Sequence, residues 1–163
     1  AKDLKNLNSK IQFILGLSHG LSIEKYNIPS WIKIENKNQK EALECANLAL
    51  VASGTATLEA AIFGTPMIII YKMAFISWLI SKLVVKTKYA GMVNIILNQS
   101  LIPEFIQNEA KVQNIFNKAK NIINSTKMQE EIKIKLFKIH NMLKVNEGAS
   151  TKAAKLIIQR MSI

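Results

Sequence analysis

The alternation of hydrophobic and polar positions is most regular near the middle of the chain, where two apolar runs flank a helical pattern. Residues 48–52 (LALVA) and 67–70 (MIII) are continuous apolar runs of strand length. Between them, residues 55–63 place apolar side chains at helical spacing, and Gly64 followed by Pro66 ends the helix. The pattern predicts a strand–helix–strand unit with parallel strands and a right-handed crossover.

Before this unit, the pattern predicts two more strands and several short helices. Residues 11–15 (IQFIL) and 31–34 (WIKI) are expected to form the strands. Asn38 and Glu41 have the spacing of a capping box at the start of a helix. The short helices are expected at residues 1–7, 22–28 and 41–46.

After the unit, the pattern becomes helical. Pro103 is expected to open a short helix, and three amphipathic helices are expected at residues 110–123, 128–145 and 149–161. We therefore expect one α/β domain over residues 1–163, with a parallel sheet of four strands and a helical C-terminal tail over residues 104–163.

The turn after the first strand of the central unit holds the residues with the clearest chemistry. Ser53 is placed to cap the next helix, and Gly54 allows a ligand to approach the backbone closely. The free N–H groups of a helix start bind anions, and Thr55 and Glu59 share one helix face, where a carboxylate suits a ribose diol. On spacing alone, a second interpretation stays open, in which Ser53 is only a cap and Glu59 only an acid favoured by the helix dipole.

The composition fits a globular protein but leaves a large positive charge to be explained. Hydrophobic residues make up 49% of the chain and charged residues 20%, which is typical of a protein with a buried core. The net charge is +11, and Arg160 is the one basic residue that is not a lysine. Because the lysines are dispersed, we expect no nucleic-acid site, whereas anionic lipid and a coding bias towards lysine both remain open explanations.

Cysteine and histidine usage gives no sign of a metal site or a disulfide. Cys45 is the single cysteine, and its place in the helical pattern predicts a buried core residue. His19 and His140 are far apart in the sequence and lack the spacing of metal ligands. We expect no metal and no cofactor.

Residues 73–85 (MAFISWLISKLVV) are strongly apolar but too short to cross a bilayer. Phe75, Trp78 and Leu79 lie close to Lys82 and other lysines, a combination typical of an interfacial helix. A membrane-facing or acyl-facing surface is therefore one interpretation, and a buried core or dimer helix is the other.

Several short motifs together resemble the nucleotide-sugar half of the lipid-A-disaccharide synthases. They are ASGTATLE at 52–59, GTPM at 64–67, YKM at 71–73 and SWLISKLVVKTKY at 77–89, followed by Asn94. The Ser-Gly-Thr…Glu element alone is also similar to other UDP-sugar enzymes, such as the glucosaminyltransferase of peptidoglycan synthesis. The added motifs make the resemblance specific.

The resemblance implies a fold and a bacterial activity. The family has the GT-B glycosyltransferase fold, with two Rossmann-like domains across a cleft, and this chain is similar to the C-terminal, UDP-sugar-binding domain. The implied reaction passes 2,3-diacylglucosamine from UDP to lipid X (2,3-diacylglucosamine 1-phosphate) in lipid A and lipopolysaccharide biosynthesis. The implied roles are pyrophosphate binding by Ser53, Gly54 and Thr55, ribose binding by Glu59, and a place in the cleft for Asn94.

The same resemblance implies the partners and the location. The expected partners are UDP-2,3-diacylglucosamine, lipid X, the inner-membrane surface, an N-terminal half supplied in cis or in trans, and a second copy of the chain. The expected location is cytoplasmic, at the periphery of the inner face of the bacterial inner membrane.

The sequence departs from the family in ways that limit the implied activity. Met92-Val93-Asn94 stands where the family usually has Leu-Pro-Asn, and no Gly-Ser-Arg phosphate loop is present. The catalytic base is expected in an N-terminal domain outside these residues. We therefore expect a fragment, a split-gene product or a decayed copy that is inactive by itself. A non-catalytic remnant that only dimerises or docks on membranes is the alternative.

Overall fold

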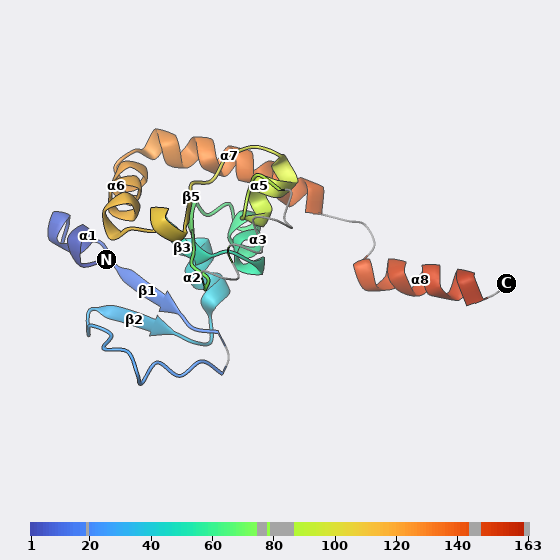
Figure 1. Ribbon diagram of the computed structural model, residues 1–163, viewed down its shortest axis with the longest axis horizontal. Helices are drawn as coiled ribbons and strands as arrows, with labels where there is room; N and C mark the ends of the chain where they lie inside the picture. The colour runs from blue at the N-terminus through green and yellow to red at the C-terminus, as the bar shows by residue number, and fades with distance from the viewer. Residues whose placement is uncertain (19, 75–77, 79–86, 144–147, 162–163) are drawn as a thin grey trace.

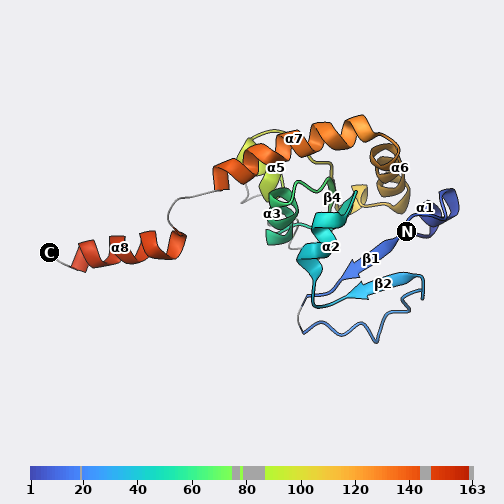
Figure 2. The ribbon, with the colours of Figure 1, turned by 180° about the vertical axis from the view of Figure 1, so that it is seen from behind.

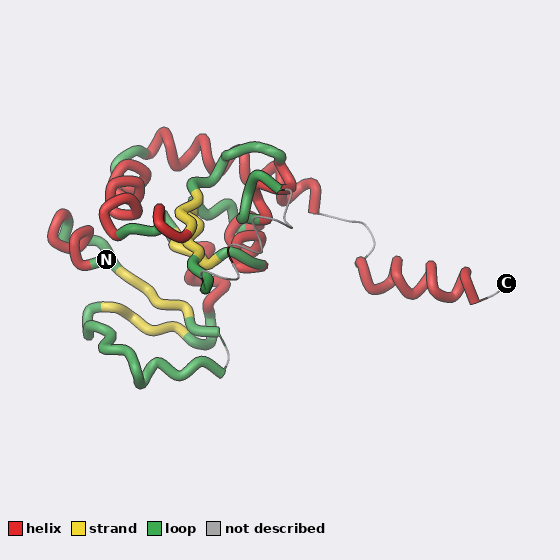
Figure 3. The backbone as a smooth tube through the Cα atoms, viewed as in Figure 1, coloured by secondary structure: helices red, strands yellow, loops and turns green. Residues whose placement is uncertain are grey.

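The computed structural model describes residues 1–163 except 19, 75–77, 79–86, 144–147 and 162–163, and it shows an α/β arrangement (Figure 1). The strands are parallel, as predicted, but they form two sheets rather than one (Figure 3). The first sheet contains β1 (Phe13–Gly16) and β2 (Ile32–Glu35). The second has the order β3 (Ala49–Ala52), β4 (Met67–Tyr71) and β5 (Glu104–Ile106).

Most of the helices lie around the second sheet, and the last helix lies away from it (Figure 1). Their bounds are α1 Lys2–Leu7, α2 Gln39–Cys45, α3 Thr55–Ile62, α5 Met92–Leu97, the 3-10 helix η1 Gln107–Glu109, α6 Val112–Ile123, α7 Thr126–Leu143 and α8 Ala149–Met161. Helix α3 packs against β3, β4 and α2, while α7 packs against α3, α5 and α6 (Figure 2). Helices α6, α7 and α8 confirm that the C-terminal part is helical, but its first residues, 104–106, form a strand instead.

The central strand–helix–strand unit forms as the hydrophobic pattern predicts. In the register, Ala49 lies opposite Met67. Gly64 ends α3 with a φ of 69°, a left-handed conformation that favours glycine. Its N–H donates to the Ala61 carbonyl, and the Thr65 N–H donates to the Ala60 carbonyl, which together make a Schellman motif.

The hydrophobic core lies where this unit meets the C-terminal helices. Strand β4 contributes three fully buried residues, because it is hydrogen-bonded on both edges and covered by helices. The buried residues of this core include Met67, Ile68 and Ile69 from β4, Val93 from α5, Ile102, Ile122 from α6, and Leu136 and Ile139 from α7.

Two predictions about local structure are wrong. Residues 22–28 form turns rather than a helix; the Tyr26 N–H donates to the Ile23 carbonyl, but no helix continues from this turn. Pro103 precedes a strand rather than a helix, because residues 104–106 pair with β4 and the Pro103 carbonyl accepts a bond from the Ile69 N–H.

Two predictions about α2 are also wrong. Cys45 is exposed, because it lies at the end of a helix of only seven residues and faces away from the core. The capping box does not form, because no side-chain bond caps this helix and the Asn38 N–H donates to Glu35 instead of Glu41.

Helix α8 lies apart from the other elements in both views (Figures 1 and 2). Its apolar residues Leu156, Ile157 and Met161 are each more than half exposed. None of the helices in the described part of the chain combines the length and the apolar composition that crossing a lipid bilayer requires.

Glu35 joins the end of β2 to the start of α2 through hydrogen bonds to its carboxylate. The N–H groups of Asn38 and Lys37 donate to its carboxylate, and with a smaller contribution from Lys33 they lower the pKa of Glu35 below 4.5. A lowered carboxyl pKa stabilises the fold above the unfolded-state value, and this stabilisation is lost as the pH falls through the folded-state pKa.

We therefore expect Glu35→Gln to lower the free energy of unfolding at pH 7, and to lose this difference as the pH falls below about 4.5. Urea denaturation of the parent and the variant at several pH values between 3 and 7 would measure this difference in unfolding free energy. The range includes the ordinary pKa of a glutamate. A difference that stays the same across this range would contradict the charge-based explanation.

Candidate functional site

The candidate site is the turn from Ser53 to Thr55, at the edge of the second sheet where β3 ends and α3 begins. Because the strands are parallel, the carboxyl ends of β4 and β5 reach the same edge. Gly54 is the N-cap residue of α3 and has φ 143° and ψ −159°. Only glycine adopts this conformation readily, and no atom lies within 4 Å of where a Cβ would be. The backbone conformation, rather than lack of space, requires a glycine here.

Ser53 does not cap α3, so this part of the prediction is wrong. Its hydroxyl donates to the Ala90 carbonyl at 2.8 Å, which ties the turn to a segment 37 residues later. No side chain caps the start of α3; within the turn, the Gly54 carbonyl accepts bonds from the Thr57 hydroxyl at 2.7 Å and the Thr57 N–H at 3.1 Å. Among the described residues, no side-chain acceptor thus occupies the first N–H groups of this helix.

Thr55 and Glu59 lie one turn apart on the same face of α3, and both are exposed. On the buried side of the same helix, Thr57, Ala60 and Ala61 are fully buried against the core. The Thr55–Glu59 face is therefore turned away from the core and is open to solvent.

Asn94 is fully buried, and its amide is saturated by bonds within the chain. Its Nδ2 donates to the Ile102 carbonyl and to the Glu104 carboxylate, both at 2.7 Å. Its Oδ1 accepts the N–H groups of Leu101 at 3.0 Å and Ile102 at 2.9 Å. Asn94 was expected to line the cleft, but its side chain is buried in α5, behind the sheet edge. It has no hydrogen-bonding group left for a ligand.

Glu104 and Gln107 form side-chain hydrogen bonds near the carboxyl edge of the sheet that no sequence pattern predicted. Glu104 begins β5, and its carboxylate accepts the N–H groups of Ala90 and Gly91 at 2.8 and 2.9 Å. No sequence pattern indicated these contacts, because β5 has only three residues and Pro103 suggested a helix.

Gln107 joins the carboxyl ends of β4 and β5 through its side-chain amide. Its Nε2 donates to the Met73 carbonyl at 3.1 Å, and its Oε1 accepts the Met73 N–H at 3.0 Å. The backbone of Gln107 has φ 51°, in the left-handed region that a glutamine rarely adopts. The amide thus continues the pairing of β4 and β5 by two more bonds, at the carboxyl edge of the sheet.

Most of the segment expected to contact membrane or acyl chains lies outside the described residues, including Phe75, Leu79 and Lys82. Trp78 is described: it is half-buried, and its N–H donates to the Ala74 carbonyl at 3.0 Å. The membrane interpretation of this segment stays a prediction.

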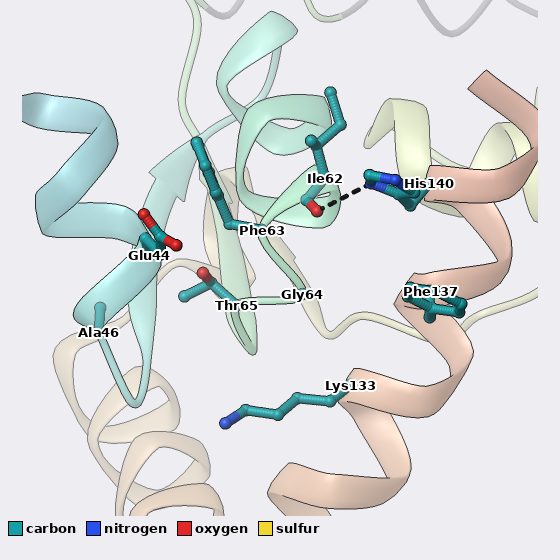
Figure 4. Close-up of a pocket in the computed structure, with 9 residues that line it drawn as sticks. All are labelled: Glu44, Ala46, Ile62, Phe63, Gly64, Thr65, Lys133, Phe137 and His140. Carbon is teal, nitrogen blue, oxygen red and sulfur yellow. Dashed lines mark hydrogen bonds between the residues drawn. The ribbon is translucent and has the colours of Figure 1, made fainter. Parts of the chain in front are cut away.

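A groove lies at the opposite edge of the sheet, between the end of α3 and α7 (Figure 4). His140 stacks on Phe137 at 5.6 Å between ring centroids, and its Nδ1 is 3.3 Å from the Ile62 carbonyl. Gly64 and Thr65 on the facing wall precede β4, so this groove is at the amino ends of the strands. It is separated from the candidate turn by the length of the sheet.

In the part of the chain that the structure describes, no three residues of the types that bind metals lie close enough to hold an ion.

Comparisons with known proteins show the family to which this chain belongs. The family model described as lipid-A-disaccharide synthetase matches residues 2–158. The chain belongs to the lipid-A-disaccharide synthase family.

Individual relatives in the family are similar over most of this chain. The lipid-A-disaccharide synthase of Rickettsia prowazekii is 38% identical over 132 residues, which cover 80% of this chain and 34% of the relative. That of Solibacter usitatus is 35% identical over 130 residues, with the same coverage of 80% and 34%. That of Rickettsia conorii is 46% identical over 88 residues, or 53% of this chain and 20% of the relative. The chain thus spans about a third of the length of the synthases that it matches.

We expect Gln107→Ala to destabilise the chain, because it removes both bonds to Met73. At about 0.5–1.5 kcal/mol for each neutral hydrogen bond, the loss in unfolding free energy should be roughly 1–3 kcal/mol. Urea denaturation would measure it, with Asn108→Ala as the matched control on the exposed neighbouring residue. Equal stability of the two variants would show that the Gln107 amide does not hold the end of β4.

Proposed function

We propose that this chain is the donor-binding part of a lipid-A-disaccharide synthase. In this proposal, the whole enzyme is an inverting glycosyltransferase that passes 2,3-diacylglucosamine from UDP to lipid X in lipid A biosynthesis. The chain contributes the UDP-sugar site, and an N-terminal domain supplies the acceptor site and the catalytic base, in cis or in trans.

The observation that carries the proposal is the turn between β3 and α3. A glycine N-cap leaves the first N–H groups of α3 without a side-chain acceptor among the described residues, at the carboxyl edge of a parallel sheet. Such a helix start favours a diphosphate through its free N–H groups and its dipole. In a member of this family, the diphosphate would be that of UDP.

In this proposal, each residue of the turn has a separate role in binding UDP. The N–H groups of Thr55 and Ala56 and the exposed Thr55 hydroxyl would bind the pyrophosphate, and Gly54 would let it approach. Ser53 would hold the turn in place, since its hydroxyl proton is already donated to Ala90. The exposed Glu59 carboxylate would accept hydrogen bonds from the ribose hydroxyls.

These contacts would also serve the chemistry. As the bond between sugar and UDP breaks, negative charge grows on the leaving diphosphate, and fixed N–H groups stabilise that charge in the transition state. Because the donors are backbone groups of a packed helix, they need little reorganisation during the reaction.

The proposed location is the inner face of the bacterial inner membrane, to which the protein would bind peripherally. The expected partners are UDP-2,3-diacylglucosamine, lipid X, the membrane surface and a second copy of the chain. The net charge of +11 supports attraction to anionic headgroups, and residues 75–85 would supply the apolar contact.

We expect this chain to bind UDP more tightly than uridine, and Glu59→Ala to weaken UDP binding. Hydrogen bonds to a charged group contribute roughly 1.5–3 kcal/mol, which is on the order of a ten- to hundredfold loss of affinity. Isothermal titration calorimetry would measure both, with Glu130→Ala as a control for the loss of one exposed carboxylate on α7. Unchanged UDP affinity in Glu59→Ala would contradict the ribose role, and no preference for UDP would contradict the pyrophosphate site.

We expect Trp78→Glu combined with Phe75→Ser to weaken binding to vesicles that contain anionic phospholipid. The pair removes two aromatic anchors and adds one negative charge beside the lysines. Co-sedimentation would measure it, with Tyr26→Glu as the control, because Tyr26 is an exposed aromatic residue in the loop between β1 and β2. Unchanged sedimentation of the folded double variant would support a core or dimer role for this segment.

A further inference from the structure

A polar network behind the candidate turn connects β5 to the start of α3. The Glu104 carboxylate accepts three bonds: its Oε2 from the Ala90 N–H at 2.8 Å, and its Oε1 from the Gly91 N–H at 2.9 Å and the Asn94 amide at 2.7 Å. The Ala90 carbonyl in turn accepts the Ser53 hydroxyl at 2.8 Å. One chain of hydrogen bonds thus runs from β5 to the residue before Gly54.

The Ala90–Gly91 segment has little room to move within this network. A Cβ at Gly91 would overlap the Cδ1 atom of Ile69, so the segment lies directly on β4. Its N–H groups are held by Glu104 and its Ala90 carbonyl is occupied by Ser53. The position of the Ala90–Gly91 segment therefore depends on the Glu104 carboxylate.

The network requires a carboxylate at position 104 rather than an amide. All three bonds are donated to Glu104, and a carboxylate only accepts. If a glutamine kept its oxygen at the place of Oε1, its NH₂ group would face the Ala90 N–H, and the two donors would repel each other. The negative charge also lies at the start of α5, where Gly91 is the N-cap and a helix favours an anion.

We infer that Glu104 is a positioning residue for the nucleotide turn. It fixes the Ala90 carbonyl, which holds the Ser53 hydroxyl and so keeps Gly54 and the first N–H groups of α3 in the orientation that a diphosphate needs. Asn94 holds the Glu104 carboxylate in place and contacts no ligand itself. The ligand named here rests on the proposed function, whereas the coupling between Glu104 and the turn does not.

A double-mutant cycle on UDP affinity tests the route through Ser53. Glu104→Gln and Ser53→Ala should each weaken UDP binding by roughly three- to tenfold, about the effect of one hydrogen bond. The double variant should bind about as well as the weaker single variant, because both changes break the same connection. Glu109→Gln, an exposed change just after β5, is the control and should bind as the parent does.

The affinity readout separates positioning from a merely structural role. All titrations are made at a temperature where circular dichroism shows each variant to be folded. If Glu104→Gln lowers the unfolding temperature but leaves UDP affinity unchanged, the carboxylate only stabilises the fold and the inference is overturned. If the two losses multiply in the double variant, the route through Ser53 is overturned.

A second measurement decides the inference even if the parent does not bind UDP, which would overturn the proposed function alone. Without ligand, the Thr57 N–H donates to the Gly54 carbonyl at 3.1 Å within the turn, so its exchange with solvent reports how well the turn is held. Glu104→Gln should raise this exchange rate by roughly three- to tenfold relative to amides of α6, and Glu109→Gln should not. Unchanged exchange of the Thr57 amide in Glu104→Gln would overturn the positioning role.

Discussion

The pairing of β4 on both of its edges is the constraint on which the rest of the structure depends. A strand with parallel neighbours on both edges is typically covered on both faces of the sheet, and Met67, Ile68 and Ile69 are fully buried. The crossover from β3 to β4 leaves room for only a short helix, so α3 has to end sharply at Gly64. The start of α3 is then fixed at the carboxyl edge of the sheet, and this edge becomes the place where a ligand can bind.

The buried polar residues around this unit each hold a connection in place. Thr65 donates to the Leu43 carbonyl at 2.7 Å and ties α2 to the start of β4, while Asn94 ties α5 to the segment before β5. Thr57 closes the turn by its bond to Gly54. A buried polar group without a partner costs about 1–3 kcal/mol, so each of these side chains favours one arrangement of its loop strongly over the alternatives. The loops near the site are therefore specified by hydrogen bonds rather than by apolar packing.

Sequence patterns predicted the elements whose bonds are local, and they missed those that depend on distant partners. The apolar runs and the helical period predicted β3, α3, β4 and the three C-terminal helices to within a few residues, because these patterns reflect burial along one element. Strand β5 was missed because three residues carry no period, and only its pairing with β4 makes it a strand. Ser53 was expected to cap α3, but its partner is Ala90, which no local spacing could reveal. The motif predicted where in the chain the candidate turn lies, whereas the partners that hold this turn were visible only in the structure.

At this edge of the sheet, the polar groups that hold the turn are distinct from the polar groups that are open to solvent. Behind the turn, every hydrogen-bonding position of the Asn94 amide is filled, and Glu104 accepts three bonds. In front of it, the first N–H groups of α3 have no side-chain acceptor among the described residues, and Thr55 and Glu59 face solvent. Unbonded polar groups are tolerated there because water can reach them, whereas the same groups in the interior would destabilise the fold. A ligand that replaced this water would meet donors whose orientation is already set by the hydrogen bonds behind the turn. Binding then loses little energy to reorganisation, which is the condition for using such donors to stabilise a growing negative charge.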